Sequence, residues 1–551
     1  MSSVVWNRFE SNVARHPDKA ALIYFEKGIW KTVTYDQLLN STNRIAFGLS
    51  ACSLTSGMRA ILMTPPSAEF FALVFALLKL GIVPIMVDPA IGLRKITECL
   101  KEASPDIFIG NTLTHTLRII FGWGKESIKH NLTIDKVKSA ALTVRLSLTV
   151  SKGQKSKVKE PIPNPHSLTS NSPAAIIYTS GSTGIPKGVL YTHSNFSAQL
   201  DMLQETFNIE QDEIDLPAFP LYVLIDVLLG VTSVIPDITF PVPGKTNPKK
   251  VLNAIQKFKV TNMFASPVVL DILVKYWSSS VQQQAVGLQN LKLQSLKRVI
   301  TAGAPATIQL QKKFRKLLNN ETNLFGVYGA TEALPIAKVE SREVFANKNK
   351  TTTGAGICLG TPVKGTQVRI IRISDSAIER WQDDLKVQSN VVGEITVQGA
   401  AVTESYIGHL EANQLAKIND GDDIIHRMGD VGYFDDQGCL WYCGRKSHRL
   451  ITKNDVLFTE QIEGIFNAHP LVYRTALVGV KSKPILWVEL EKDFQTNQDK
   501  IKSELIELSK EHPQASQIKV FLFMKKFPTD VRHNSKIIRE ELTVLAEKRF
   551  A

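Results

Sequence analysis

The sequence predicts an α/β protein with a β-rich part and a small α+β C-terminal domain, and three observations carry this prediction. Helix-like and strand-like segments alternate through most of residues 1 to 330, which favours a largely parallel sheet with helices on its faces. Short strands between turns follow over residues 361 to 443, which favours an antiparallel part. The chain beyond Lys446 is long enough for a small domain of its own, at about 100 residues. We therefore expect two domains, 1–446 and 447–551.

Length and charge bound the class of protein. A chain of 551 residues is too long for a single hydrophobic core, so at least two domains are expected. The formal net charge of +13 fits an anionic ligand, and it also fits nucleic acid or an acidic membrane surface. Lysine and arginine are scattered, without a basic block or an RNA-binding signature. This distribution disfavours nucleic acid.

Cysteine usage and the N-terminus favour a cytoplasmic protein. Five cysteines without a framework spacing are typical of a reducing compartment. Cys439 and Cys443 invite a metal hypothesis, but no second Cys/His pair lies near them in the sequence and the run around them is apolar. We expect them to be small buried side chains. The first residues lack the basic and apolar regions of a signal peptide.

One segment, Phe70 to Val87, approaches the length and apolarity of a membrane span. A lysine, a glycine and a proline interrupt it. We therefore expect a buried helix from about Ser67 to Leu80, then a buried strand from Ile82 to Val87, and at most peripheral contact with a membrane.

Hydrophobic periodicity places the remaining elements. Helices are expected at Phe9–Ala14, Tyr35–Leu49, Leu93–Glu102, His193–Phe207, Pro248–Phe258, Ser266–Trp277, Glu460–Ala468, Ile501–Glu511 and Ile537–Lys548. Strands are expected at Ala60–Met63, Pro173–Tyr178, Asn262–Ala265, Lys297–Ala302, Gln367–Ile373, Gly393–Gln398, Leu440–Tyr442, Arg474–Val480, Ile485–Glu491 and Lys519–Phe523. Composition predicts solvated loops at residues 151–172 and 278–294.

The stretch Tyr178 to Gly188, YTSGSTGIPKG, has the composition of a phosphate-binding loop. Its glycines let backbone N–H groups turn toward an anion, its hydroxyls add donors, and its lysine adds positive charge. It is not a Walker A loop, because Gly188 follows Lys187 where Ser or Thr is needed. A flexible linker is disfavoured by the apolar strand that precedes it. The candidate nucleotide-binding residues here are Thr179, Ser180, Gly181, Ser182, Thr183, Gly184 and Lys187.

A second constellation, Asn323 to Glu332, is an apolar strand that ends in a glycine turn, a hydroxyl and a carboxylate. Glu332 is the candidate Mg²⁺ ligand, holding the ion against the phosphates. Thr331 is the candidate donor to the α-phosphate, and both residues are catalytic candidates. Small residues upstream would admit a flat adenine beside a tyrosine. The further nucleotide-binding candidates are Gly303, Ala304, Tyr328 and Gly329.

Two more signals lie in the last third of the chain. Asp430, at the end of a predicted strand, can accept hydrogen bonds from ribose hydroxyls, and Arg445 can neutralise phosphate or bridge the two domains. Asp435 and Asp436 fit a hairpin turn instead. Lys536 stands just before an amphipathic helix, where it could reach an acyl carboxylate and the α-phosphate as charge develops. Lys536 is the third catalytic candidate.

Taken in order, the loop, the segment from Tyr328 to Glu332, Asp430, Arg445 and Lys536 resemble the motifs of the adenylate-forming superfamily over nearly the whole chain. The resemblance implies a large N-terminal domain of stacked α/β sheets with a β-rich subdomain, and a mobile C-terminal cap that carries the catalytic lysine. It implies ATP and Mg²⁺ as cofactors, with a carboxylate attacking the α-phosphorus to give acyl-AMP and pyrophosphate.

Two positions depart from the common pattern of that superfamily. Ser447 stands in the hinge region where an acidic residue is usual, and Ser535 rather than glycine precedes the lysine. The surrounding segments, 444–449 and 528–536, are similar to those of olefin-pathway β-lactone synthetases, as are 216–221 and 328–335. This resemblance implies a long-chain 2-alkyl-3-hydroxy fatty acid whose own hydroxyl closes a β-lactone, and other enzymes of an olefin or lipid pathway as partners.

The same motifs are compatible with two other functions. A fatty acyl-CoA synthetase or fatty acyl-AMP ligase would share the first half-reaction, and a non-catalytic nucleotide-binding protein could keep the fold. The base for lactone closure is unassigned, with His193 and His533 as candidates that are more often structural. An apolar acyl pocket is expected from the region Phe219 to Leu229 and the helix that begins at Ser266. A dehydrogenase is disfavoured because the glycine spacing after Gly354 does not match a dinucleotide loop.

Overall fold

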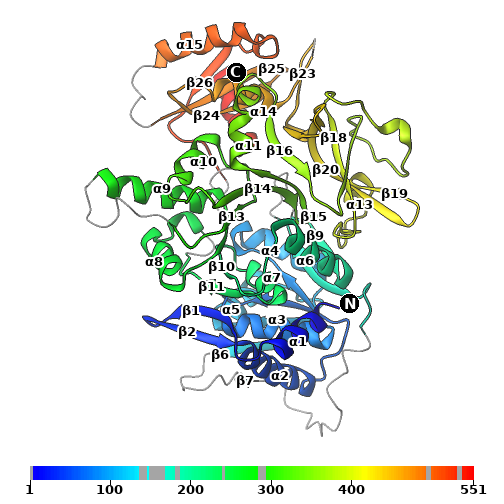
Figure 1. Cartoon of the computed structure of the whole chain (residues 1–551). Helices are drawn as coiled ribbons and strands as arrows, with labels where there is room; N and C mark the ends of the chain where they lie inside the picture. Colours follow the sequence, from blue (N-terminus) through cyan, green and yellow to red (C-terminus); the bar gives the residue numbers. More distant parts are fainter. Residues whose placement is uncertain are drawn as a thin grey trace.

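The structure is a computed structural model, shown in Figure 1. It describes residues 4–135, 145–147, 168–179, 186–238, 242–282, 293–453, 455–491, 498–529 and 536–550. The predicted α/β architecture is confirmed. Two large sheets with helices between and around them form most of the molecule, and a smaller α+β domain follows at the C-terminal end of the chain.

The first large sheet has seven strands, all of them later in the chain than β2. Its order is β7-β6-β5-β3-β4-β8-β9, and its inner pairs are parallel as the alternation of elements predicted. The edge pairs β6·β7 and β8·β9 are antiparallel. The strands are β3 (Arg59–Met63), β4 (Val83–Met86), β5 (Ile107–Gly110), β6 (His130–Asp135), β7 (Arg145–Ser147), β8 (Pro173–Tyr178) and β9 (Gly188–Thr192).

The second large sheet has fourteen strands and joins the parallel part to the β-rich part without a break. Its order is β17-β18-β20-β21-β16-β15-β14-β13-β12-β10-β11-β1-β2, with β19 paired to β20. The stretch from β14 to β1 is parallel, and the rest is antiparallel. The strands are β1 (Ala20–Glu26), β2 (Ile29–Thr34), β10 (Ile214–Pro217), β11 (Thr232–Ile235), β12 (Asn262–Ala265), β13 (Arg298–Thr301), β14 (Asn323–Ala330), β15 (Ala333–Glu340), β16 (Ile357–Pro362), β17 (Gln367–Ile371), β18 (Gly393–Gln398), β19 (Lys417–Asp420), β20 (Asp423–Phe434) and β21 (Leu440–Arg445).

The helices cover these sheets and bury their apolar faces against them. The helices of the large part are α1 (Val5–Arg15), α2 (Tyr35–Ala51), α3 (Ala68–Leu80), α4 (Leu93–Ala103), α5 (Thr112–Phe121), α6 (His193–Phe207), α7 (Tyr222–Leu229), α8 (Pro248–Phe258), α9 (Pro267–Gln282), α10 (Ile308–Arg315), α11 (Ser341–Ala346), α12 (Lys348–Thr352) and α13 (Leu410–Ala416). The expected loop over 278–294 is wrong at its start, because α9 continues through Gln282. Residues 283–292, and residues 151–167 of the other expected loop, lie outside the described chain.

Most of the apolar segment Phe70 to Val87 lies in the core helix α3, and its end forms β4. Eleven of the thirteen residues of α3 are buried, and they pack in one cluster with α1, α2 and α7. Ser67 caps its N-terminus through the Phe70 N–H, and Gly81 ends it with a φ of 69°, which favours glycine. Within the described residues, every helix is too short or too polar to cross a bilayer.

The C-terminal part buries both faces of a three-stranded sheet, β24-β25-β26. Along β24, Leu477 packs toward α14 and α15, whereas Ala476 and Val478 pack toward α16, as the alternation of side chains along a strand requires. A two-stranded ribbon, β22·β23, precedes this sheet. The elements are β22 (Leu450–Ile451), β23 (Val456–Leu457), α14 (Thr459–Phe466), β24 (Val472–Val480), β25 (Lys483–Leu490), α15 (Gln498–Glu511), β26 (Val520–Phe523) and α16 (Arg539–Phe550).

The cysteines of the β-rich part are buried, as expected from the apolar run around them. Cys443 is fully buried, and Cys439 is 8% exposed. The partner of Cys439 is Cys358 on the neighbouring strand, with 3.3 Å between the two Sγ atoms.

Candidate functional site

The candidate phosphate loop leaves β8 and returns as β9. At its base, the Thr179 N–H donates to the Lys187 carbonyl at 3.0 Å, and the Lys187 N–H donates to Thr179 Oγ1 at 3.2 Å. These two bonds bring the ends of the loop together. Ser180, Gly181, Ser182, Thr183 and Gly184 lie outside the described residues, so their expected role stays a prediction.

Thr331 and Glu332 form the turn between β14 and β15, where Ala330 pairs with Ala333. Gly329 is required just before this turn, because an added Cβ would lie 2.6 Å from Leu334 Cδ1 and 2.9 Å from the Ala333 carbonyl. The parallel pairing of β13 with β14 sets Thr301 beside Gly326.

The same register places the residues that are expected to lie beside an adenine. Gly303 and Ala304 follow β13 after Ala302, at the edge of the sheet toward which the parallel strand β14 carries Tyr328. Gly303 has a φ of 91°, a conformation that favours glycine. The structure therefore brings Gly303, Ala304 and Tyr328 to the edge where the Thr331–Glu332 turn begins.

The Thr331–Glu332 turn is fixed from outside its own hairpin. The Tyr191 hydroxyl donates to the Thr331 carbonyl. The Thr403 N–H and hydroxyl both donate to the Glu332 carbonyl, at 2.9 and 3.1 Å. The Tyr406 hydroxyl donates to Glu332 Oε1 at 2.7 Å. Tyr191, Thr403 and Tyr406 were absent from the sequence-based candidates.

The lysine of the phosphate loop meets the same turn. Lys187 Nζ lies 5.0 Å from the centre of the Tyr406 ring, and strand β9 pairs locally with the segment that carries Tyr406. A short chain of contacts thus joins Lys187, Tyr406 and Glu332, although they come from three separate parts of the sequence.

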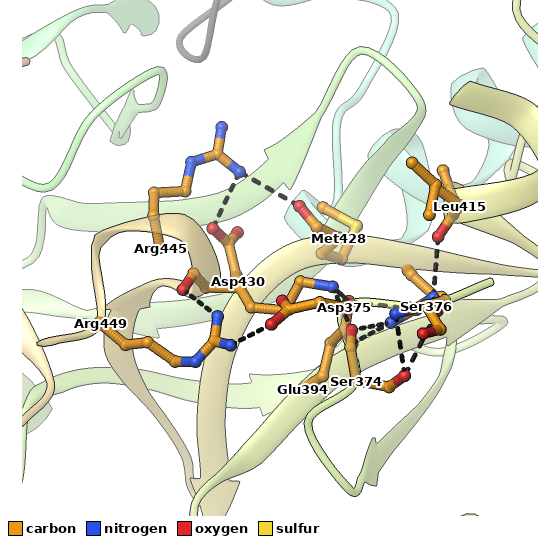
Figure 2. Close-up of polar contacts among 12 residues, drawn as sticks. Ser374, Asp375, Ser376, Glu394, Leu415, Met428, Asp430, Arg445 and Arg449 are labelled. Atoms are coloured by element: carbon orange, nitrogen blue, oxygen red, sulfur yellow. Dashed lines mark hydrogen bonds and ion pairs between the residues drawn. The ribbon is translucent and has the colours of Figure 1, made fainter. Parts of the chain in front are cut away.

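Asp430 lies on β20 and receives hydrogen bonds at both carboxylate oxygens. The Tyr328 hydroxyl donates to Oδ2 at 2.7 Å, and Arg445 donates to Oδ1 at 2.9 Å and to the Met428 carbonyl at 3.1 Å (Figure 2). Burial raises the pKa of Asp430, while the positive charges of Arg445 and Lys536 oppose that shift. Each carboxylate oxygen has a second acceptor site, so Asp430 can still accept bonds from a ribose.

Lys536 enters the site from the C-terminal domain. It precedes α16, where Ile537 makes an isolated bridge to Thr529. Its positive charge opposes the rise in the pKa of Asp430 that burial causes, so the lysine interacts electrostatically with the candidate ribose acceptor. Its contact with an acyl carboxylate stays a prediction.

The junction after Arg445 is anchored to the loop Ser374–Asp375–Ser376. Lys446 Nζ donates to the Ser374 carbonyl at 2.7 Å and lies 3.1 Å from Glu394 Oε1. Arg449 pairs with Asp375, and Figure 2 shows Arg445 directed toward Asp430 and Arg449 toward Asp375. Ser447 stands where an acidic residue is usual in the superfamily that the motifs resemble. It lies between Lys446 and Arg449, two cations that already have acidic partners.

The other candidates fall outside this group or within the core. His193 is 1% exposed and begins α6, and burial lowers its pKa to about 4. His533 lies outside the described residues. Every residue of α7 is buried, and most of them belong to the main hydrophobic cluster. The acyl pocket expected there stays a prediction.

The chain is similar to known proteins over most of its length. Residues 9–407 match the model of a family described as AMP-binding enzyme. Olefin beta-lactone synthetase from Xanthomonas campestris pv. campestris is 39% identical over 525 residues, covering 94% of this chain and 91% of the relative. The protein of the same name from Stenotrophomonas maltophilia is 39% identical over 528 residues, with the same coverage.

Solved structures share the fold across the whole chain. O-succinylbenzoate coenzyme A synthetase from Bacillus subtilis, in complex with ATP and magnesium ion, superposes with a TM-score of 0.73 at 20% identity, covering 97% of this chain and 99% of that one. ATP-bound MatB from Rhodopseudomonas palustris has a TM-score of 0.76 at 17% identity, covering 100% of both chains.

Proposed function

The chain belongs to the AMP-binding enzyme family, and we propose that it converts a long-chain 2-alkyl-3-hydroxy fatty acid into a β-lactone with ATP. The observation that carries this proposal is the identity of 39% along 94% of the chain to two olefin beta-lactone synthetases. The candidate site is compatible with it, because a carboxylate turn, a buried Asp–Arg pair and a lysine converge there.

The residues present fit a nucleotide and a divalent cation. Tyr406 occupies only Oε1 of Glu332, and no described residue donates a hydrogen bond to Oε2, so one hard oxygen ligand is available to Mg²⁺. Arg445 pairs with Asp430, and the charge of Lys536 also acts on Asp430; these two positive charges suit a phosphate. When bound, Mg²⁺ would neutralise charge on the phosphate oxygens.

The first step that we propose forms acyl-AMP. A carboxylate oxygen of the fatty acid attacks the α-phosphorus of ATP, the new O–P bond forms, and the bond to pyrophosphate breaks. Lys536 stabilises the negative charge that develops, and the Thr331 hydroxyl donates to the α-phosphate. The Asp430 carboxylate holds the ribose hydroxyls, so that the phosphorus and the acid are kept in line.

The second step uses the substrate's own hydroxyl. The 3-hydroxyl oxygen attacks the activated carbonyl carbon, the hydroxyl loses its proton, and the bond from that carbon to the AMP oxygen breaks. Nucleophile and electrophile belong to one molecule, which makes closure of the four-membered ring efficient without coenzyme A. His193 does not serve as the base in this proposal, because it is enclosed in the core near Val5.

A second candidate is a fatty acyl-CoA synthetase or fatty acyl-AMP ligase. More distant relatives favour it, such as 4-coumarate-CoA ligase 1 from Narcissus pseudonarcissus, which is 24% identical over 93% of this chain. It would share the adenylation step.

The main proposal also includes a cytoplasmic location and at most peripheral contact with a membrane. It includes the division of the chain into domains 1–446 and 447–551 as well.

One experiment separates these functions. The protein is incubated with ATP and Mg²⁺ and either a 2-alkyl-3-hydroxy fatty acid or a plain fatty acid, with and without coenzyme A, and products are identified by mass spectrometry and NMR. We expect a β-lactone, AMP and pyrophosphate from the hydroxy acid without coenzyme A. A thioester that needs coenzyme A would support the second candidate, and no pyrophosphate from either acid would indicate a non-catalytic nucleotide-binding protein.

A further inference from the structure

Tyr406 is held rigidly at the point where it meets Glu332. Its N–H donates to Asn413 Oδ1 at 2.7 Å, and Asn413 Nδ2 donates back to its carbonyl at 3.0 Å. The residues on either side bond to β9, through Leu190 N–H to the Ser405 carbonyl and Ile407 N–H to the Gly188 carbonyl. The backbone of Tyr406 is therefore fixed from two directions, and its hydroxyl has a defined direction toward Glu332 Oε1.

Lys417 is a buried cation behind the same pair. It is 8% exposed, its Nζ donates to the Thr403 carbonyl, and it lies 5.7 Å from the centre of the Tyr406 ring. Thr403 is also the residue that holds the Glu332 carbonyl. Lys417 thus restrains the segment from Thr403 to Tyr406, which touches Glu332 at both its main chain and its side chain.

A buried lysine is costly unless its surroundings compensate it. Burial lowers the pKa of Lys417 to about 8, and the negative charges of Glu332 and Glu404 oppose that shift. His426 also faces Lys417, and burial and this lysine lower the pKa of His426. The lysine is therefore placed where a nearby carboxylate offsets its charge, rather than in neutral apolar surroundings.

We propose that Tyr406 and Lys417 are positioning residues that aim the free oxygen of Glu332 at the divalent cation of the metal–nucleotide complex, a role that rests on the nucleotide-binding half of the proposed function. The Tyr406 hydroxyl fixes the carboxylate rotamer by engaging Oε1. Lys417 keeps the Thr403–Tyr406 segment in place from behind. Tyr406 and Lys417 lie 74 and 85 positions from Glu332 in the sequence, so neither belongs to the turn that they orient.

The test measures ATP binding by calorimetry across a titration of Mg²⁺, with no acid substrate. Tyr406→Phe removes only the hydroxyl. We expect it to raise the Mg²⁺ concentration needed for half-maximal ATP binding about tenfold, since a hydrogen bond to a charged group contributes at about this level. Affinity for ATP without Mg²⁺ should stay within about twofold, because the other nucleotide contacts are intact.

Lys417 is tested by two substitutions with opposite expectations. Lys417→Met should raise the Mg²⁺ requirement by about threefold, because the Thr403–Tyr406 segment loses its restraint. Lys417→Arg keeps the positive charge and a hydrogen-bond donor. Its Mg²⁺ requirement should therefore stay within about twofold of the wild type. A lower Mg²⁺ requirement in Lys417→Met would overturn its role, since simple charge repulsion of the metal would then dominate.

Matched controls exclude a general loss of packing. Lys338 makes the same kind of contact, donating to the Thr206 carbonyl at 2.7 Å with Phe207 and Phe325 near its ammonium group. The Tyr433 hydroxyl donates to the Ala355 carbonyl at 3.2 Å. Lys338→Met and Tyr433→Phe should leave the Mg²⁺ requirement unchanged.

Several outcomes would overturn the proposal. An unchanged Mg²⁺ requirement in folded Tyr406→Phe would do so, and so would equal shifts in the two controls. If Lys417→Met does not fold, Tyr406→Phe still decides, and a Mg²⁺ requirement of Lys417→Arg well outside about twofold of the wild type would contradict the role given to Lys417. A wild-type protein that binds ATP with Mg²⁺ but forms no lactone would contradict the proposed reaction alone, whereas a protein that binds no ATP would contradict both.

Discussion

The two carboxylates of the site lie in different parts of one sheet and are held in opposite ways. Asp430, on β20 in the antiparallel part, has both oxygens engaged, by Tyr328 and Arg445. Glu332, in the turn that closes the parallel part, receives a hydrogen bond from the described residues at Oε1 alone, from Tyr406. The Tyr328 hydroxyl spans the two parts, because Tyr328 belongs to β14 and its acceptor to β20.

This difference separates two tasks within one site. A carboxylate whose oxygens are already oriented is suited to accept further hydrogen bonds in a fixed direction, as a ribose needs. A carboxylate with one open oxygen is suited to a hard cation. The third charged group, Lys536, comes from another domain and acts on Asp430 through its charge. We therefore expect the large domain to supply binding and Lys536 to supply rate.

The largest effect should come from removing Lys536, because this breaks the division between binding and rate. Lys536→Ala should lower the rate of adenylation by about a hundredfold or more, since charge that develops during attack loses its stabilising partner. ATP affinity should change by less than about threefold, because Tyr328, Asp430 and Arg445 keep their contacts. Pyrophosphate release and calorimetric ATP binding measure the two quantities separately.

Lys526→Ala is the matched control, because Lys526 is an exposed lysine in the same C-terminal segment. It should leave both quantities unchanged. Unchanged pyrophosphate release in Lys536→Ala would remove this lysine from the reaction, and a parallel loss of ATP affinity would contradict the division of tasks.

Local patterns in the sequence predicted most of the fold. Helices α6 and α8 and strands β8, β12 and β18 match the expected bounds, because hydrophobic patterning marks the elements and capping residues mark the helix starts. Thr192 and Asn247 cap α6 and α8 at the expected starts. Asp430 was expected at the end of a strand, but it lies inside β20, which continues to Phe434. The twelve residues of β20 contain two glycines and several charged side chains, which hide the alternation on which strand prediction depends.

The sheet that joins the two parts could not be predicted from local patterns. The sequence predicted an antiparallel part but not how it joins the parallel strands; β15 pairs with β16 and makes the sheet continuous. Such a pairing is set by tertiary contacts and leaves no periodic signal in either strand.

The candidate site shows the same limit. Thr331, Glu332, Asp430 and Arg445 stand in short motifs, so they could be chosen from the sequence. Tyr191, Thr403, Tyr406 and Lys417 support them from distant positions and carry no motif of their own. A tyrosine that orients a carboxylate across 74 positions looks in the sequence like any half-polar core residue.

A smaller effect should follow from changing Asp430, and it sharpens the contrast between the two carboxylates. Asp430→Asn keeps the shape but loses the negative charge and one acceptor oxygen. We expect ATP affinity to fall about tenfold, because a charged acceptor is replaced by a neutral one and the ion pair with Arg445 is lost. The Mg²⁺ requirement should stay near that of the wild type, since Glu332 is untouched.

Asp435→Asn is the control for this change. Asp435 is a turn residue between the same two strands, and its carboxylate accepts bonds from Trp441 Nε1 and the Cys439 N–H. Its substitution should lower thermal stability and leave ATP affinity unchanged. Equal losses of affinity in the two variants would show that Asp430 acts through the strand pair rather than on the nucleotide.

The smallest effect concerns His193, and it tests whether this residue belongs to the scaffold or to the reacting groups. Burial lowers its pKa to about 4, below the value of about 6.5 in an unfolded chain. Between these values the unfolded chain binds more protons, so stability that is present above pH 6.5 is lost as the pH falls toward 4. We therefore expect the free energy of unfolding, measured in urea, to fall between pH 7.5 and 5.5 by about 1 kcal/mol more in the wild type than in His193→Gln. If the difference in unfolding free energy between the two proteins does not change with pH, His193 titrates normally and is open to solvent. A base for lactone closure would have to be open in this way.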